Sequence, residues 1–269
     1  MGYRDYHLHT KFSFDSREEP ENTCRKAVEL GLEEICFTEH FEFGADDAPW
    51  TDIGRWNEEI DRCRELFAGK LIILQGIEAG QPQKEADRAK KLMDSLSYRL
   101  DFVIGSIHIC GNNGRPSKFG FTKESYKEYF KNYFEDAKEL AVTGDFDVMA
   151  HLTFPFRYVS EDILREYPIY GFESDFREIF DILISRGKGI EINTSGLRTG
   201  LASTMPDEQI VSWYRQQGGQ ILTIGSDGHS AKSAGSGIVD GYKVAENAGF
   251  TGTTAFRGRN LQFVKWTNE

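Results

Sequence analysis

Two histidines lie two residues apart in the segment Tyr6-His7-Leu8-His9-Thr10. The pattern around them predicts a strand over Arg4–His9. Because residues i and i+2 of a strand point to the same face, both imidazoles can reach a single metal ion. A His-X-His pair alone is weak evidence, since such rings are also found as ordinary hydrogen-bonding groups. Further candidate ligands elsewhere in the sequence are therefore needed to support a metal site.

All six histidines of the chain lie at, or just after, the C-terminal end of a predicted strand. Two acidic residues follow the same rule, because Glu78 ends the third predicted strand and Asp227 follows the seventh. Taken singly, each is more often a hydrogen-bonding residue or a helix cap. Taken together they indicate a metal centre, since no histidine is left for a helix face or a loop tip. The histidines concerned are His7, His9, His40, His108, His151 and His229.

Strand-like and helix-like segments alternate along almost the whole chain. The clearest helix carries an aromatic face that includes Tyr126, Tyr129, Phe130, Tyr133 and Phe134, which we interpret as core packing. A short helix and a β-like tail, Thr253–Trp266, complete the chain. Seven strands separated by helices favour parallel βαβ units. The predicted strands are Arg4–His9, Glu34–Glu39, Leu71–Glu78, Phe102–His108, Asp147–His151, Gly189–Asn193 and Gln220–Gly225.

Two α/β architectures fit this alternation, an open doubly wound sheet and a closed barrel. In a parallel barrel the C-terminal ends of all strands meet on one face, where active sites are found. An open sheet would spread seven strand ends along a line that is too wide for one cluster. The positions of the polar residues therefore favour an α/β barrel. No linker-like stretch or break in composition is visible, so we expect a single domain over residues 1–269.

The charge and composition of the chain restrict the kinds of binding partner that we expect. The net charge is −11 and no basic stripe is present, which argues against nucleic acid. No apolar run approaches about 18 residues, so no membrane span is expected. The first ten residues lack the apolar segment of a signal peptide, and the four cysteines form no Cys-X-X-Cys pair. We therefore expect free thiols in a reducing cytoplasm; no pattern indicates the oligomeric state.

The types of candidate ligand restrict which metal ions the site could bind. Imidazole combined with carboxylate suits Zn, Mn, Fe or Co, and a structural zinc site would be expected to use paired cysteines. The candidates exceed what one ion can bind, and three ions with bridging carboxylates would use them. Ions about 4 Å apart can generate hydroxide and clamp a phosphoryl group. This chemistry points to phosphate ester hydrolysis.

The ordered set of motifs resembles the PHP (polymerase and histidinol phosphatase) superfamily, and more closely its histidinol-phosphate phosphatases, over nearly the full chain. The segments that carry the resemblance are Asp5–Thr10 with Asp15, Phe37–His40, Gly76–Gly80, Gly105–His108, Ala150–Leu152, Glu191–Gly196 and Ser226–His229. The resemblance implies a distorted (β/α)7 barrel with a trinuclear centre of divalent transition metals (Zn, Mn or Fe). It also implies a small phosphorylated substrate, L-histidinol phosphate, in histidine biosynthesis.

The resemblance also assigns ligands to each ion. One ion would be held by His7, His9, Glu78 and Asp227, a second by Glu78, His108 and His151, and a third by Asp15, His40 and His229. Glu78 would bridge the first two ions. Asp15 stands where many members of the superfamily have a histidine, which adds negative charge to the site.

These assignments lead to an expected mechanism. Hydroxide between the first two ions would attack phosphorus in line, while the third ion binds a phosphoryl or leaving-group oxygen. The candidate catalytic residues are Asp227, His229 and Arg198. Arg198 and Arg157 follow the sixth and fifth strands and could clamp the phosphate bidentately. Glu42, two residues after His40, could meet a cationic group of the substrate.

Three other functions fit part of this pattern. A PHP phosphoesterase could act on another small phosphate ester or on a nucleotide. A non-catalytic metal-binding module would have the same fold, although its ligand set should have decayed. A metal-dependent amidohydrolase would also use strand-end histidine and aspartate, but we find no candidate carbamylated lysine at a strand end. Metal analysis and a panel of phosphomonoesters would separate these possibilities.

Overall fold

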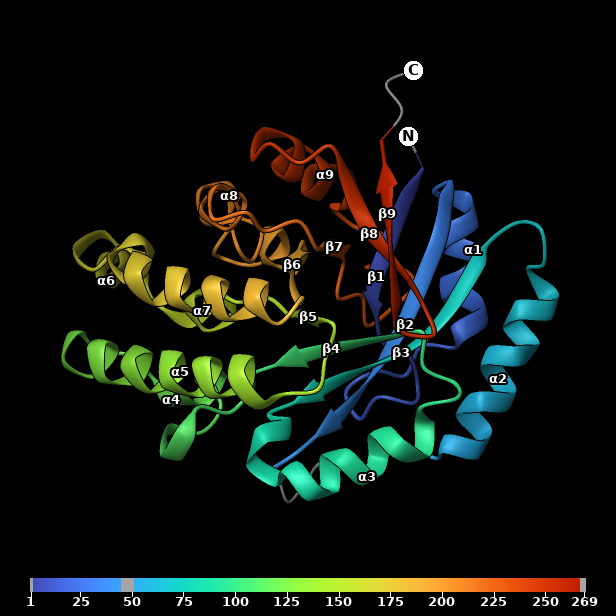
Figure 1. The fold of residues 1–269 in the computed structure, drawn as a ribbon, viewed down its shortest axis with the longest axis horizontal. Helices are drawn as coiled ribbons and strands as arrows, with labels where there is room; N and C mark the ends of the chain where they lie inside the picture. The colour runs from blue at the N-terminus through green and yellow to red at the C-terminus, as the bar shows by residue number, and fades with distance from the viewer. Residues whose placement is uncertain (1, 45–50, 267–269) are drawn as a thin grey trace.

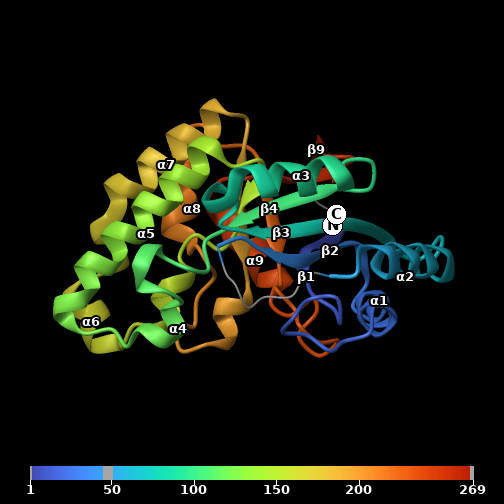
Figure 2. The same cartoon turned by 90° about the horizontal axis from the view of Figure 1, so that it is seen from below.

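The computed structural model describes residues 2–44 and 51–266. Its main sheet has seven parallel strands whose spatial order equals their order in the chain, and helices surround them (Figures 1 and 2). The seven strands form a nearly closed barrel, which confirms the predicted α/β barrel. The strands are β1 Tyr3–Leu8, β2 Leu32–Glu42, β3 Ile72–Gly80, β4 Phe102–Ser106, β5 Val148–Met149, β6 Gly189–Asn193 and β7 Leu222–Gly225.

Helices cover the outside of the barrel. The predicted aromatic face of α5 is buried, and its rings pack against Phe156, Phe172 and Phe176. Thr122 caps α5 by accepting a hydrogen bond from the backbone N–H of Ser125. The helices are α1 Pro20–Glu29, α2 Ile53–Leu66, α3 Ala86–Leu96, α4 Pro116–Phe119, α5 Lys123–Thr143, α6 Glu161–Glu166, α7 Glu173–Ser185, α8 Glu208–Gln216 and α9 Ile238–Asn247.

The barrel closes where the first strand meets the last. A single parallel bridge joins Leu8 to Gly228, and the N–H of His9 donates to the carbonyl of Gly228 at 2.9 Å. Deeper in the seam, the carboxylate of Asp5 accepts from the N–H of Ser226 at 2.8 Å. Gly225 permits this approach, because a Cβ there would lie 2.4 Å from the Cβ of His7. The seam therefore brings the end of the first barrel strand next to the segment that follows the last one.

The predicted β-like tail forms an antiparallel hairpin of β8 (Gly252–Arg257) and β9 (Asn260–Lys265). Phe256 of this hairpin is buried in the barrel interior, with its ring centroid 4.8 Å from that of Phe102. Tyr6 lies beside both rings, and its hydroxyl accepts from the N–H of Phe256 at 3.1 Å. The hairpin crosses the barrel strands in Figure 1. It fills the barrel interior, so the polar cluster lies at the other end.

Five of the seven strands differ in length from their predictions, and β2 and β5 differ the most. β2 runs on to Glu42, three residues beyond the predicted end, because its pairing with β3 continues without a break from Glu34 to Glu42, which lies opposite Gly80. β5 has only two residues in the ladder, since the backbone of His151 turns to a positive φ of 23°. Both differences lie at the edge where the histidines gather. Among the described residues, none of the helices has the length and apolar character needed to cross a bilayer.

Candidate metal site

All nine predicted metal ligands converge at the C-terminal mouth of the barrel. His7 lies in β1, His40 in β2 and Glu78 in β3, and the β2–β3 register places His40 beside Glu78. The others lie on the segments that follow β1, β4, β5 and β7. Parallel strands explain the convergence, because all of them end at the same rim. The ligands beyond the strand ends are His9, Asp15, His108, His151, Asp227 and His229.

Glu78 lies at the centre of the cluster. Its Oε2 is 3.1 Å from Nε2 of His7 and 3.1 Å from Nδ1 of His40. Its Oε1 is 2.9 Å from Nε2 of His151 and 3.1 Å from Nε2 of His108. One carboxylate thus faces different histidines with each of its oxygens, which is the geometry expected of a bridging ligand.

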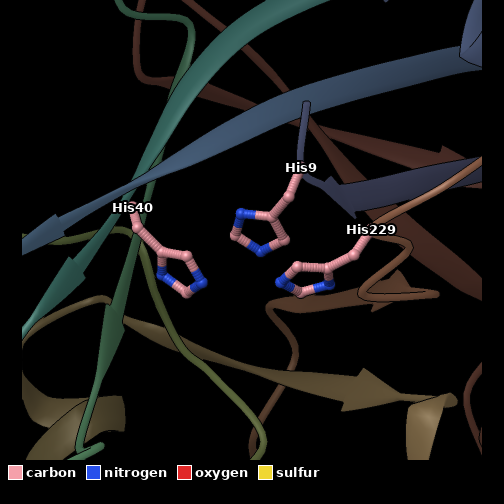
Figure 3. Close-up of side chains that lie close together, drawn as sticks. All are labelled: His9, His40 and His229. Carbon is pink, nitrogen blue, oxygen red and sulfur yellow. The ribbon is translucent and has the colours of Figure 1, made fainter. Parts of the chain in front are cut away.

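A second part of the cluster lies nearer the surface. Oδ2 of Asp15 is 3.1 Å from Nε2 of His229 and 3.4 Å from Nε2 of His40. His9 lies between His40 and His229 (Figure 3), with ring centroids 4.1 Å and 4.3 Å from theirs. Oδ1 of Asp227 is 3.5 Å from both Nε2 of His9 and Nδ1 of His229. Asp227 and His9 therefore join the outer part to the inner part.

The ring nitrogens of the cluster are placed to bind cations and not to form hydrogen bonds with one another. Nε2 of His7 lies 3.0 Å from Nε2 of His9, and Nε2 of His108 lies 3.4 Å from Nε2 of His151. Nδ1 of His40 is buried and lies 3.1 Å from Oε2 of Glu78, but it has no partner with hydrogen-bond geometry within the described part of the chain. Among the described residues there are five groups of three whose ligand atoms, within each group, lie no more than 4.8 Å apart. Imidazole lone pairs that converge in this way, with carboxylates among them, can hold several divalent ions.

A second layer of acceptors fixes the rings. Nδ1 of His7 lies 2.7 Å from Oε1 of Glu191. Nδ1 of His9 lies 3.0 Å from Oγ of Ser13, which donates its own hydrogen to Glu39 at 2.6 Å. With Nδ1 as the donor in each ring, Nε2 is left with its lone pair toward the cluster. The layer therefore selects the tautomer that binds metal.

Glu42 belongs to this second layer. Its Oε1 lies 2.6 Å from Nδ1 of His108, and its Oε2 accepts from the side-chain amide of Gln81 at 3.1 Å. The side chain is buried and does not line the cavity described below. This placement favours a role in orienting His108 and gives no support to the predicted contact with a cationic group of the substrate.

The electrostatics keep the carboxylates charged. Burial alone would raise the pKa of Glu78, but His108, His7 and His40 lower it well below its ordinary value. Burial likewise opposes the charge of Glu42, and His108 overcomes this to bring the pKa of Glu42 to about 2. Conversely, burial would lower the pKa of His108, but Glu42 and Glu78 raise it to about 9. The carboxylates are therefore available as ligands at neutral pH.

The cluster opens into a cavity of about 160 Å³. Seven of the nine predicted ligands line it, whereas His7 and His9 lie beneath it, fully buried. A larger cavity, of about 310 Å³, lies beside α3, and its lining of mainly apolar side chains includes no histidine. The smaller cavity is therefore the one that gives access to the candidate metal ligands. The ligands that line it are Asp15, His40, Glu78, His108, His151, Asp227 and His229.

The two arginines predicted to bind phosphate are placed differently. Arg157 lines the cavity, with its Cζ 4.3 Å from the ring of Phe154 and its Nη2 donating to the hydroxyl of Tyr158 at 2.7 Å. Arg198 does not line it; its Nη2 donates to the carbonyl of Ser226 at 2.7 Å. Arg198 thus holds the backbone next to Asp227.

Several polar residues of the site were not predicted as functional. Ser13, Glu39 and Glu191 belong to the second layer, and Arg115 lines the cavity. The position of Glu39 next to His40 gave a weak signal, as did the four-residue spacing of Ser13 from His9. Arg115 lies in the irregular segment between β4 and α5, where sequence periodicity carries no information about direction.

The fold and the site place the protein among α/β barrels that carry a cluster of metal ligands at the C-terminal ends of their strands. The family model of the PHP domain matches residues 5–195, and the chain belongs to this family. Among characterised relatives, it is 28% identical over 266 residues to the histidinol-phosphatase of Lactococcus lactis subsp. lactis, covering 96% of this chain and 95% of that protein. It is also 28% identical to a probable histidinol-phosphatase of Deinococcus radiodurans, covering 97% of this chain and 99% of that one.

A solved structure gives the same picture in three dimensions. The crystal structure of histidinol phosphate phosphatase from Lactococcus lactis subsp. lactis, complexed with zinc, L-histidinol and phosphate, superposes with a TM-score of 0.82. The sequences are 27% identical, and the match covers 97% of this chain and 98% of that one. The fold of the putative histidinol phosphatase of Listeria monocytogenes is also similar, with a TM-score of 0.75 at 20% identity.

Proposed function

We propose that this chain is a metal-dependent phosphomonoesterase that hydrolyses L-histidinol phosphate to L-histidinol and phosphate in histidine biosynthesis. The observation that carries the proposal is the convergence of six histidines and three carboxylates beside the guanidinium of Arg157, at the mouth of a PHP barrel. The full-length similarity to histidinol-phosphatases supports the choice of substrate. The cytoplasmic location expected from the sequence stays a prediction, as does the absence of nucleic-acid partners.

We propose that the cluster holds three divalent ions, with zinc, manganese or iron as candidates. His7, His9, Glu78 and Asp227 would hold one ion, and Glu78, His108 and His151 a second. Asp15, His40 and His229 would hold the third. Bound ions would supply a nucleophile from water at neutral pH and would neutralise phosphoryl charge. Zinc in the similar crystal structure supports this choice of cofactor.

The other side chains of the site would bind the phosphate and hold the metal ligands in place. Arg157 would bind the phosphate, because its guanidinium faces the cavity and no carboxylate of the described chain pairs with it. Glu191, Ser13 and Glu42 would keep three histidines in the tautomer that binds metal. Asp227 and His229 would contribute to catalysis through the metals, and Arg198 through the segment that carries them.

We also propose that residues 1–269 form one domain. Support comes from the hairpin β8–β9, which packs Ala255 and Phe256 into the interior of the barrel beyond the part that the family model matches. Without the hairpin the interior would lose part of its core.

The deciding experiment combines metal analysis of the purified protein with a panel of phosphomonoesters. We expect three metal ions per chain and a kcat/KM for L-histidinol phosphate that exceeds that for other esters by orders of magnitude. A comparable preference for another ester would refute the substrate but leave the chemistry in place. A metal-loaded protein that hydrolyses none of the esters would refute the enzymatic function.

A further inference from the structure

Arg115 lies at the rim of the cavity on a segment with well-defined anchors. The backbones of Cys110 and Gly114 form an antiparallel bridge, and Pro116 begins α4 immediately after Arg115. The N–H of Gly111 donates to Oδ2 of Asp136 in α5 at 2.7 Å. Gly114 has a φ of 72°, which suits glycine, and Pro116 restricts the backbone of Arg115 itself. The segment thus holds Arg115 beside the candidate metal site.

The guanidinium of Arg115 is not used elsewhere in the described structure. It makes no hydrogen bond or ion pair with any residue in the ranges 2–44 and 51–266. Its one defined contact is with the ring of Phe14, whose centroid lies 5.8 Å from Cζ. Phe14 in turn stacks on His40, with ring centroids 5.0 Å apart and planes at 29°. A guanidinium in a cavity with no carboxylate paired to it is available to an anion.

Arg157 is placed in a similar way on another part of the wall. Its guanidinium lies over Phe154, and the Phe154 ring packs against that of His151 at 4.9 Å. The cavity therefore has two arginine–phenylalanine pairs, each resting on an imidazole of the cluster. Its volume of about 160 Å³ is below that of typical ligand pockets, so a small ligand would lie within reach of both arginines.

We propose that Arg115 is a specificity-determining residue that binds the phosphate group of the substrate from the Phe14 side of the cavity. Together with Arg157 it would favour the dianion of a phosphate monoester over anions with a single charge. A contact with the amine of histidinol phosphate is disfavoured, because both groups are cationic and have only donors. The inference rests on the proposed phosphatase function, which it deepens.

The test compares Arg115→Ala and Arg115→Lys with Lys118→Ala. Lys118 is exposed three residues further on, outside the cavity lining, and its loss changes the net charge equally. The first measurement is the dissociation constant of inorganic phosphate, determined by calorimetry on zinc-loaded protein with equal metal content and thermal stability. We expect Arg115→Ala to weaken phosphate binding by about 10- to 100-fold, Arg115→Lys to recover part of this, and Lys118→Ala to change it less than about 2-fold.

The second measurement is kcat/KM with L-histidinol phosphate and with phenyl phosphate, whose leaving group is uncharged. Arg115→Ala should reduce both by a similar factor. Unchanged phosphate affinity in Arg115→Ala would overturn the inference, as would a gain for the cationic ester relative to the neutral one. If wild-type protein failed to hydrolyse histidinol phosphate but phosphate binding still depended on Arg115, the proposed substrate would be refuted and the anion site supported.

Discussion

Oε1 of Glu42 lies 2.6 Å from Nδ1 of His108, and both side chains are buried. The contact is a charge-assisted hydrogen bond that turns Nε2 of His108 toward Glu78. Glu42 was expected to meet the substrate, but its geometry is that of a residue acting through a histidine. The two roles make different predictions.

Replacing Glu42 should affect the metal more than the substrate. We expect Glu42→Ala to reduce zinc affinity by about 10- to 100-fold, because His108 loses the acceptor that orients it. Glu42→Gln should retain most of the affinity, since its amide oxygen can still accept from Nδ1. Competition with a chelator of known affinity measures the effect, and Glu29→Gln on the surface of α1 is the control. Normal zinc affinity in Glu42→Ala with a raised KM would instead favour direct substrate contact.

The same pair should make the stability of the metal-free protein depend on pH. The pKa of Glu42 falls from its ordinary 4.5 to about 2, so its contribution is present above pH 4.5 and is lost as the pH falls. The pKa of His108 rises from 6.5 to about 9, so its contribution is present below pH 6.5 and is lost as the pH rises toward 9. Urea unfolding after chelation should therefore show the largest advantage of wild type over Glu42→Gln between pH 4.5 and 6.5. An advantage that grows from pH 6.5 to 9 would contradict this.

Ser13 should matter more than its small size suggests. Its hydroxyl oxygen is 3.0 Å from Nδ1 of His9, accepts from the N–H of His40 at 3.1 Å and donates to Glu39. We expect Ser13→Ala to lower zinc affinity by about 10-fold or more, with Ser13→Thr restoring much of it. Ser185→Ala, at the exposed end of α7, serves as the control. Equal zinc affinity in Ser13→Ala and wild type would show that the hydroxyl does not orient His9.

Arg198→Ala should affect both catalysis and metal binding. Sequence reasoning predicts a loss of about 100-fold or more in kcat/KM, from transition-state stabilisation. Because Arg198 donates to the carbonyls of Ser226 and Asp227, we expect zinc affinity to fall as well. Arg215→Ala is a matched control, since Arg215 also donates to carbonyls but lies in α8, away from the site. If Arg198→Ala reduced kcat/KM but kept full zinc affinity, Arg198 would instead stabilise the transition state directly.

Phe256 should contribute strongly to the stability of the barrel. Its side chain is 3% exposed and packs on Phe102 in the interior. Phe256→Ala should lower the free energy of unfolding by about 3–5 kcal/mol, as is typical for a buried aromatic side chain. Phe263→Ala in β9, where the side chain is 51% exposed, should cost far less. Chemical denaturation of both variants measures the difference, and equal losses would show that Phe256 does not anchor the hairpin.

The sequence predicts the barrel well because its signals are local and repeated. Each strand is a short apolar run, and the ligands lie at the strand ends, so parallel topology alone brings Glu78 to His151. The second layer is harder to predict, because Glu191 in the middle of a strand and Glu42 just beyond a predicted strand look like ordinary carboxylates in sequence. Only the fold shows that they face Nδ1 of His108 and of His7. Arg115 lies in an irregular segment, where hydrophobic periodicity does not show which way a side chain points.

The seam between Leu8 and Gly228 has a consequence for how the protein is made. His7 and His9 emerge from the ribosome first, but Asp227 and His229 lie some 220 residues later. A growing chain therefore cannot complete the proposed first metal position until its last barrel strand has been synthesised and has joined β1. Complete metal loading would therefore follow the synthesis of β7, and any fragment cut before β7 would lack Asp227 and His229.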